Sequence, residues 1–434
     1  MSHIPLAPFL LLTSASGILL SLDRMLHVGR EAVAALPSGP DDRDDLLSEP
    51  KVTFDTSFGR LRVYSRADAI SRSCWDENYP RQWKGLDFYQ VVDKTMRHQF
   101  NMQYLVLEDE ANEVKCVQPI FLVEQNLLEE IPSYLRWLRG LIKAIFPSLG
   151  KTKILMAGSP IAESHLGGRK GEERDVTRAA LMEAVERYAR HADVSLIVLK
   201  DLGAPYRGSL ELFREHGYTR LESFPWVKLA LDYKSFEDYM QRKLSQKMRR
   251  DLRLKFRKSA AAGLEFEVVA DITQDSARIH ELYLQVAKRS PVQFDVLTEE
   301  YFALIGRRLS EHTRFFLWRR NGEIVAFTFC VVEGDAIYDN DVGLDYLIAH
   351  DLHLYFVTRR DMIQWATEQG LTTYFCSPFT YDPKLHMKMD LVPMDLYVRH
   401  RSAPINLLLR LLAPRFAPAR SEPLLRQFSN YSEL

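Results

Sequence analysis

The chain has 434 residues, of which 46% are hydrophobic and 26% are charged, and its formal net charge is −1. These values are typical of a folded globular protein and exclude a disordered or fibrous chain. A net charge this close to zero excludes a general polyanion binder, and the length favours two domains because single hydrophobic cores stop growing at about 250–300 residues.

Residues 1–50 divide into an apolar segment and a linker. The stretch "IPLAPFLLLTSASGILLSL" (4–22) is apolar enough to suggest a signal peptide. It lacks a Lys or Arg region before the apolar run, and Pro5 and Pro8 interrupt it, so a packed or loosely docked helix is favoured over secretion. Residues 37–50 are rich in Pro, Ser and Asp and are predicted to form an exposed linker.

Residues 51–232 form the first predicted domain. Two helical stretches precede a hairpin-like pair of strands, and alternating helices and strands complete this half. The predicted helices are 67–75, 87–98, 176–191 and 210–216, and the predicted strands are 103–107, 114–122, 154–157, 195–200 and 226–231.

Residues 233–400 repeat this order and form the second predicted domain, which we expect to be the catalytic one. The pair Asn321-Gly322 is a strong hairpin signal. The predicted helices are 272–288, 298–310, 352–366 and a short one around Lys384, and the predicted strands are 264–270, 315–318, 324–332, 336–342, 372–376 and 394–398. Such alternation predicts an α/β protein with two related domains, each a mixed, mostly antiparallel sheet flanked by helices.

A strongly basic segment opens the second half. Residues 243–258 ("KLSQKMRRDLRLKFRK") carry eight basic side chains and one acid. Apolar residues recur every four positions and predict a buried stripe, made of Leu244, Met248, Leu252 and Phe256. Like charges this close destabilise a helix unless an anion compensates. We therefore predict a phosphate-facing helix, rather than a merely solvated one, with donor- or phosphate-binding residues Lys247, Arg249, Arg250 and Arg253. The phosphate could belong to the donor, to an RNA backbone or to a phosphorylated acceptor.

The order of elements, with the stretches "FEDYMQRKLSQKMRRDLRLKFRKSAAAGLEFE", "FFLWRRNGEIVAFTFCVVEGDAIYDNDVGLDY" and "YFCSPFTYDPKLHMKMDLVPMDLYVRH", resembles two tandem GNAT (Gcn5-related) acyltransferase domains. Two such halves joined through a basic helix are similar to the bacterial Fem-like peptidyltransferases and FemAB-like proteins. The resemblance implies a cytoplasmic bacterial N-acyltransferase. It would move an acyl group from acyl-CoA to a small-molecule or peptide amine.

Two alternatives stay open. One is a Fem-like enzyme that uses aminoacyl-tRNA and acts on a cell-wall or lipid precursor. The other is a non-catalytic binding module on the same fold. Acyl-CoA is the expected co-substrate, but the usual glycine-rich pyrophosphate loop is missing, because Gly343 is the only glycine in "VGLDYLIAHDLHLYF". No metal cofactor is expected, since His350 and His353 lack a third ligand.

Four side chains are candidates for catalysis or phosphate binding. In "AIYDNDVGLD", a period of two places Asp339 and Asp341 on one face of a strand. Two neighbouring carboxylates raise each other's pKa, which suits a general base, although one could instead pair with an arginine. The resemblance further implies that Lys384 contacts a phosphate or the oxyanion and that Tyr381 protonates the leaving group. The alternatives are a surface lysine and a structural tyrosine.

The C-terminal tail, 401–434, is apolar and basic. Its segment "INLLLRLLAPRFAPARSEPLLRQF" (405–428) contains arginines but no lysine. Such a segment could lie on a membrane surface, or its leucines could cover the back of the second sheet. The four cysteines form no C-x-x-C pair, which favours free thiols in a reducing compartment.

Overall fold

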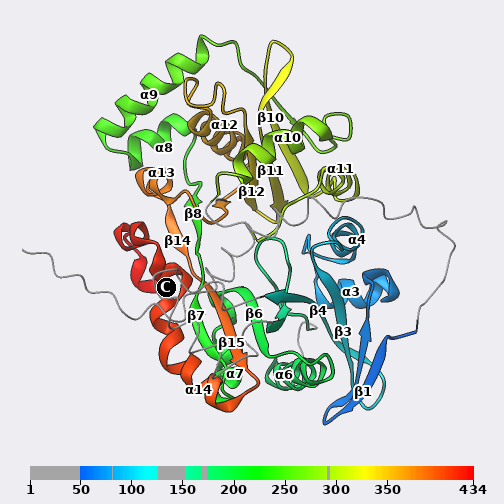
Figure 1. Cartoon of the computed structure of the whole chain (residues 1–434). Coiled ribbons are helices and arrows are strands. Elements are labelled where there is room, and N and C mark those ends of the chain that lie inside the picture. Colours follow the sequence, from blue (N-terminus) through cyan, green and yellow to red (C-terminus); the bar gives the residue numbers. More distant parts are fainter. Residues whose placement is uncertain (1–48, 81, 126–151, 169–173, 291–293) are drawn as a thin grey trace, which may run out of the picture.

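The computed structural model describes residues 49–80, 82–125, 152–168, 174–290 and 294–434 (Figure 1). The predictions for the apolar segment 4–22 and for most of the linker 37–50 lie outside the described residues. No helix in the described part of the chain is long and apolar enough to cross a membrane. The four cysteines, all within the described residues, form no disulfide.

The sequence analysis did not predict the hairpin at the start of the first half or the strand Thr219–Glu222 near its end, and the other elements follow the expected order. The strands of this half are β1 (Val52–Thr56), β2 (Gly59–Tyr64), β3 (Asn101–Glu108), β4 (Val114–Gln125), β5 (Thr152–Ala157), β6 (Leu196–Gly203) and β7 (Thr219–Glu222). Its α-helices are α3 (Arg72–Asn78), α4 (Leu86–Thr95), α6 (Arg174–His191) and α7 (Glu211–Glu215).

The second half follows the predicted order closely. Its strands are β8 (Trp226–Ala230), β9 (Glu265–Val269), β10 (Thr313–Arg320), β11 (Glu323–Glu333), β12 (Ala336–Leu344), β13 (Thr373–Cys376), β14 (Asp390–Val392) and β15 (Met394–His400). Its α-helices are α8 (Phe236–Lys243), α9 (Gln246–Ala260), α10 (Ser276–Ala287), α11 (Glu299–Arg308), α12 (Leu354–Glu368), α13 (Tyr381–His386) and α14 (Ala403–Leu412). The predicted hairpin at Asn321-Gly322 is confirmed, since β10 and β11 pair across it.

The two sheets exchange strands. The order in the eight-stranded sheet is β1-β2-β3-β4-β5-β6-β15-β7, and in the seven-stranded sheet it is β14-β8-β13-β12-β11-β10-β9. The division between residues 232 and 233 assigned β8 to the first domain and β15 to the second, and the pairing contradicts this for both strands. Strand β8 pairs with β13 and β14, whereas β15 lies between β6 and β7. The period of a strand reveals its two faces but not its partner.

Helices separate and cover the two sheets. One hydrophobic core contains residues of α3, α4, α10 and α11 together with the inner faces of both sheets. A second core joins α8, α9 and α12 to the outer face of the seven-stranded sheet, and a third joins α6 to the outer face of the eight-stranded sheet. The basic helix α9 therefore lies across the outer face of one sheet, not between the two (Figure 1).

Candidate functional site

Two central strands of the second sheet part from each other, which leaves an opening between them. Strands β12 and β13 pair in parallel from Ala336 and Thr373 to Asp339 and Cys376. Strand β13 ends there, while β12 continues to Leu344 alongside β11. Beyond Asp339, one side of β12 has therefore lost its neighbouring strand, and this is where we place the candidate site.

A bulge at the start of this opening changes which faces the acids occupy. Phe329 pairs with Asp341 and Cys330 pairs with Asp339, so Asn340 is an extra residue on β12. The prediction that Asp339 and Asp341 share one face is therefore wrong, because the inserted residue reverses the alternation. Both polar side-chain atoms of Asn340 are buried and lack a hydrogen-bond partner within the described part of the chain.

Asp339 faces α12 and belongs to a buried ion pair. Its side chain is bonded to the guanidinium of Arg359, and both residues are almost fully buried. The hydroxyl of Tyr374 donates to Asp339 Oδ2 at 2.5 Å, and Arg359 Nη1 donates to the same hydroxyl at 2.8 Å. These contacts match the alternative in which the acid pairs with an arginine, and they indicate a structural role.

Asp341 lies on the opposite face, beside α10 and α11. Its carboxyl makes no hydrogen bond or ion pair with another residue that the structure describes. Burial raises its pKa to about 8, and the negative charge of Asp295 adds to this shift. Burial also raises the pKa of Asp295 to about 6, although Lys200 opposes that shift. A raised pKa was expected for one acid of the pair, but its second cause is Asp295 and not Asp339.

Asp295 is a residue that the sequence analysis missed. It lies on the segment after α10, which docks against the first half. Val296 N donates to Gln99 Oε1 at 3.0 Å, and the ring of Phe294 lies 5.4 Å from that of Phe100. Neither motif nor spacing pointed to Asp295, because its place beside Asp341 depends on how the two halves pack.

Buried charges also meet between the halves. Lys84 is 1% exposed, and its Nζ lies 3.0 Å from Glu163 Oε1. Burial, followed by the charge of Glu163, raises the pKa of Glu333 to about 7. No group of three or more His, Cys, Asp or Glu side chains suited to a metal ion occurs among the described residues.

Tyr381 and Lys384 are buried residues of α13, the helix that follows β13 in the chain. The Tyr381 hydroxyl donates to the carbonyl oxygen of Pro225 at 2.8 Å. Lys384 Nζ donates to the carbonyl oxygens of Ser377 and Phe379 at 2.5 and 2.6 Å, and the residue is 3% exposed. Burial lowers the pKa of Lys384, and the nearby thiol of Cys376 opposes this effect. Lys384 is therefore not a surface lysine.

These bonds fix the loop that follows β13. Phe379 and Thr380 have φ angles of 68° and 49°, in the left-handed region that side chains seldom adopt. The Phe379 ring also packs on that of Phe224, at a centroid distance of 4.8 Å. Lys384 bonds carbonyl groups within this loop, so its observed contacts are those of a residue that holds the loop in place.

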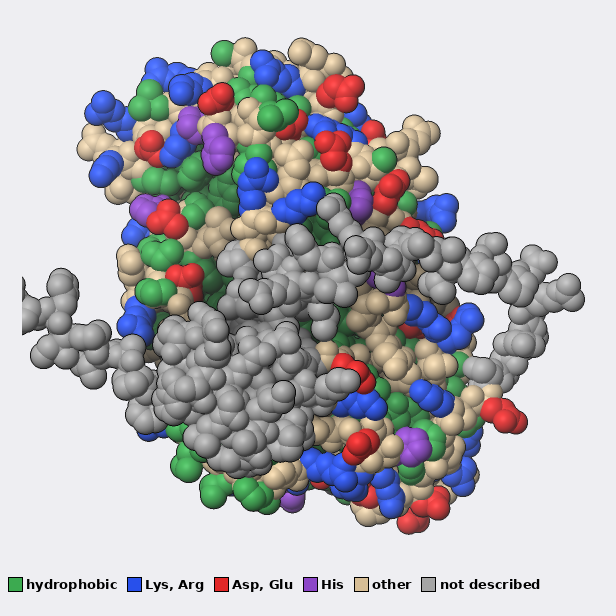
Figure 2. Space-filling model, in the orientation of Figure 1, with side chains coloured by type: hydrophobic (Ala, Val, Ile, Leu, Met, Phe, Trp, Pro, Cys, Tyr) green, Lys and Arg blue, Asp and Glu red, His purple; other side chains and the backbone are tan. Residues whose placement is uncertain are grey.

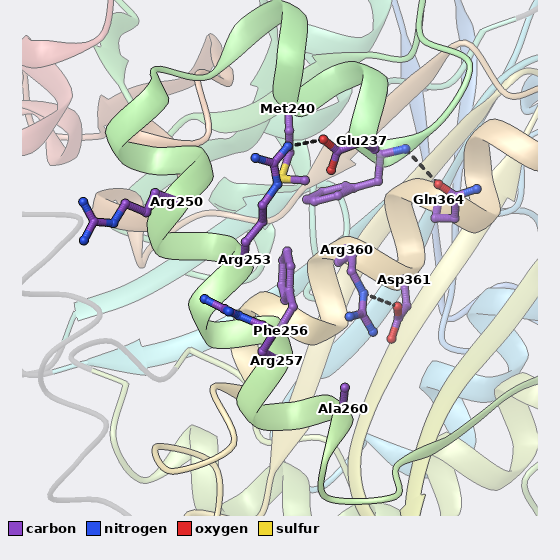
Figure 3. A pocket seen from close by; sticks show the side chains of 11 residues that line it. Glu237, Met240, Arg250, Arg253, Phe256, Arg257, Ala260, Arg360, Asp361 and Gln364 are labelled. Carbon is purple, nitrogen blue, oxygen red and sulfur yellow. Dashed lines mark hydrogen bonds and ion pairs between the residues drawn. The ribbon is translucent and has the colours of Figure 1, made fainter.

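The basic helix α9 borders a groove of about 800 Å³ (Figure 3). Apolar and charged side chains from α8, α9 and α12 line it, and they are Phe236, Glu237, Met240, Arg250, Arg253, Phe256, Arg257, Ala260, Arg360, Asp361 and Gln364. Figure 3 shows Arg253 turned toward Glu237 and Arg360 toward Asp361, while Arg250 points away from both pairs.

The predicted phosphate-binding residues have different surroundings. Arg253 is paired with Glu237. Arg249 donates to the carbonyl oxygens of Gln241 and Leu244 at 3.2 and 2.9 Å and so caps the end of α8. Lys247 and Arg250 are exposed, and neither forms an ion pair within the described ranges. Lys and Arg side chains gather over α8 and α9 at the upper left of Figure 2.

The predicted site residues do not converge on one cavity. The groove beside α9 lies on the outer, α12 side of the second sheet, whereas Asp341 lies on the α10 side. The predicted buried stripe of α9 is confirmed in part, since Leu244 and Leu252 are buried and Met248 and Phe256 pack against the same core.

The comparisons with known proteins confirm the predicted resemblance. The sequence profile of the FemAB-like family, described as peptidoglycan biosynthesis/recognition, matches residues 86–375. The crystal structure of FemX superposes with a TM-score of 0.51 at 11% identity, and the match covers 79% of this chain and 98% of FemX. A tandem GNAT protein from the clavulanic acid biosynthesis pathway gives 0.45 at 11% identity, covering 79% and 99%. The predicted fold class, two mixed and mostly antiparallel GNAT-like sheets flanked by helices, is confirmed.

The curated proteins that match are much longer than this chain. A protein of Mycobacterium tuberculosis named "Putative 8-amino-7-oxononanoate synthase 2" is 22% identical over 285 residues. The match covers 62% of this chain and 36% of that protein. The chain thus spans about a third of the length of the curated relatives it matches.

Proposed function

Because the chain belongs to the FemAB-like family, we propose that it is a transferase that moves an acyl or aminoacyl group onto an amine of a peptidoglycan precursor. The observation that carries the proposal is the carboxyl of Asp341, with its pKa of about 8, at the point where β12 leaves β13. A group with a pKa near the working pH is suited to accept the proton that an attacking amine loses.

The proposed step needs no covalent intermediate on the protein. The acceptor nitrogen attacks the donor carbonyl carbon, a C–N bond forms, and the proton on nitrogen passes to the Asp341 carboxylate. Collapse of the tetrahedral intermediate breaks the bond to the leaving oxygen or sulfur, which takes up the proton that Asp341 accepted, and the carboxylate is restored. Backbone N–H groups of β12 on the side vacated by β13 are the proposed oxyanion donors.

The donor we favour is an aminoacyl-tRNA. A Cβ added to Gly343 would lie 2.2 Å from a Phe327 ring carbon and 2.8 Å from the carbonyl carbon of Leu282. This glycine therefore serves the packing of α10 on β12, and nothing comparable to a glycine-rich pyrophosphate cradle follows β12. Acyl-CoA, the donor expected first from the resemblance, is the second candidate.

The outward face of α9 supports the tRNA donor. Four exposed cations at helical spacing form no ion pair with the residues described here, and they are Lys247, Arg250, Arg257 and Lys258. A row of unpaired cations attracts a nucleic-acid backbone by releasing its counterions. A cytoplasmic location, where charged tRNA is available, belongs to the same proposal.

The remaining predicted residues receive positioning roles in this proposal. Tyr381 and Lys384 hold the loop after β13 through their bonds to main-chain carbonyls. Asp339 holds α12 against the sheet through Arg359. None of the three is then the acid or base of the reaction.

The experiment offers the purified protein a panel of aminoacyl-tRNAs and acyl-CoAs with amine-bearing peptidoglycan precursors, and it identifies products by mass spectrometry. We expect a product one aminoacyl residue heavier than the precursor, formed by the wild type and by Asp55→Asn but not by Asp341→Asn. Asp55 is exposed on β1 and serves as the matched control. A product from acyl-CoA alone would replace the tRNA donor, and binding without any product would favour a recognition module.

A further inference from the structure

The C-terminal helix α14 is apolar on the side that faces solvent. Three of its leucines, Leu407, Leu408 and Leu411, are 58%, 41% and 59% exposed. None of its ten residues is fully buried. At 100° per residue, these leucines fall with Pro404 on one arc of the helix. A surface helix normally presents polar side chains on this arc, so its composition requires an explanation.

The opposite arc of α14 already has a partner. Leu409 packs against the central core, and α14 lies along β15 of the eight-stranded sheet. Asn406 Nδ2 donates to the carbonyl oxygen of Gly217 at 2.9 Å, and its Oδ1 accepts from His400 N at 2.8 Å. The alternative in which the leucines of 405–428 cover the back of the second sheet is therefore wrong for α14. Its inward side is fixed on the first sheet, and its outward leucines are exposed.

The charged side chains between residues 403 and 421 are of one sign. Arg410 is exposed beside them on α14, and Arg415 follows one turn after the helix ends. No Asp or Glu occurs between residues 403 and 421. The nearby Arg420 is neutralised by Glu222, at 2.9 and 3.0 Å. The arginines at 410 and 415 have no acidic partner in the part of the chain that the structure describes.

We propose that α14 is a membrane-surface helix that inserts Leu407, Leu408 and Leu411 into an anionic bilayer, with Arg410 and Arg415 at the headgroups. Apolar side chains flanked by arginines are what an interfacial helix needs. In Figure 1, α14 lies at the edge of the molecule, away from the opening beside β12, so a bilayer could contact it without covering that opening.

A second copy of the chain fits this face less well. A helix of ten residues is about 15 Å long and about 10 Å wide. Its footprint is far below the roughly 800 Å² per partner that a stable protein contact buries. A bilayer needs neither a large flat area nor a complementary shape, so the small, apolar and basic surface of α14 favours lipid.

The test is co-sedimentation of the full chain with vesicles of phosphatidylcholine alone or with 30–40% phosphatidylglycerol, a range we chose to supply excess negative charge. We expect the wild type to bind only the anionic vesicles, and Leu407→Ser/Leu411→Ser to lose binding about tenfold or more. Arg410→Gln/Arg415→Gln should weaken binding and reduce its salt dependence. Leu347→Ser, at an 88% exposed leucine elsewhere, is the matched control and should bind as the wild type does.

Three outcomes would overturn the proposal. The first is failure of the wild type to bind anionic vesicles, and the second is full binding by Leu407→Ser/Leu411→Ser. The third is a concentration-dependent dimer, detected by light scattering, that this double variant abolishes, which would assign the face to a second copy. Because both leucines are exposed, the variants should keep the circular dichroism and the unfolding midpoint of the wild type, so loss of binding cannot be attributed to unfolding.

Discussion

Each face of strand β12 carries one aspartate, and the two aspartates have different surroundings. On the α12 face, Asp339 is bonded to Arg359 and Tyr374 in a fully buried network. On the α10 face, Asp341 has no partner among the residues described and has a raised pKa. The bulge at Asn340 produces this difference. A paired acid stabilises the fold, whereas an unpartnered buried acid costs stability, and we infer that the role of Asp341 is proton transfer.

The largest loss of stability is expected from removing Asp339 from its ion pair with Arg359. Asp339→Ala leaves the Arg359 guanidinium buried without its carboxylate, and such a loss costs about 3–5 kcal/mol of unfolding free energy. Urea denaturation measures it. Asp339→Leu/Arg359→Met, which replaces the ion pair by apolar side chains, should recover most of the loss. If Asp339→Ala unfolded at the wild-type urea concentration, the structural role of the pair would be refuted.

Removing the charge of Asp341, on the other face of β12, should instead stabilise the protein at high pH. The folded-state pKa of Asp341 is about 8 and its usual value is 3.8, so between these pH values the folded protein binds more protons than the unfolded chain. Its contribution to stability therefore falls as pH rises from about 4 to about 8. Asp341→Asn should be more stable than the wild type at pH 8, by several kcal/mol, and similar at pH 4. Denaturation at the two pH values measures this. Equal stability at both would mean that Asp341 ionises normally.

A smaller loss of stability is expected from the loop that follows β13. Lys384→Met removes the donor to the carbonyls of Ser377 and Phe379, and leaving such buried acceptors unpaired costs about 1–3 kcal/mol. Thermal unfolding measures the change, with the exposed Lys234→Met as the matched control. A loss of phosphate-ligand affinity with unchanged stability would instead return Lys384 to the phosphate-binding role.

The smallest change in stability is expected from the exposed charges on α8 and α9. The pair between Arg253 and Glu237 is about half exposed on both sides, so Arg253→Gln should change stability by about 0.2–1 kcal/mol, and less in high salt. Arg250→Gln, which removes an unpaired exposed cation, should leave stability unchanged and weaken binding of tRNA. Equal tRNA affinity of Arg250→Gln and the wild type at low salt would argue against α9 as the nucleic-acid surface.

The sequence predicted the elements of the fold better than their partners. Helical period identified α9, α10 and α12, and Asn321-Gly322 identified a hairpin, because these signals are local. The exchange of β8 and β15 between the sheets was not predictable, since it depends on contacts between residues far apart in the chain.

The candidate site shows the same limit. The polarity of the strand identified Asp341. The face of the sheet predicted for it was wrong, because nothing in the residues "YDND" indicates a bulge. Asp295 was missed because it reaches Asp341 only through tertiary packing. Lys384 was identified by resemblance, but its burial follows from the loop that it bonds.

The central claim, that Asp341 takes the proton of the acceptor amine, is tested most directly by the pH dependence of transfer. Initial rates from the active donor would be measured between pH 6 and 9 for the wild type, Asp341→Asn and Asp55→Asn. We expect the wild type and Asp55→Asn to gain rate through an apparent pKa near 8. Asp341→Asn should be at least about 100-fold slower and lack this rise. Wild-type rates and an unchanged pH profile in Asp341→Asn would contradict the account.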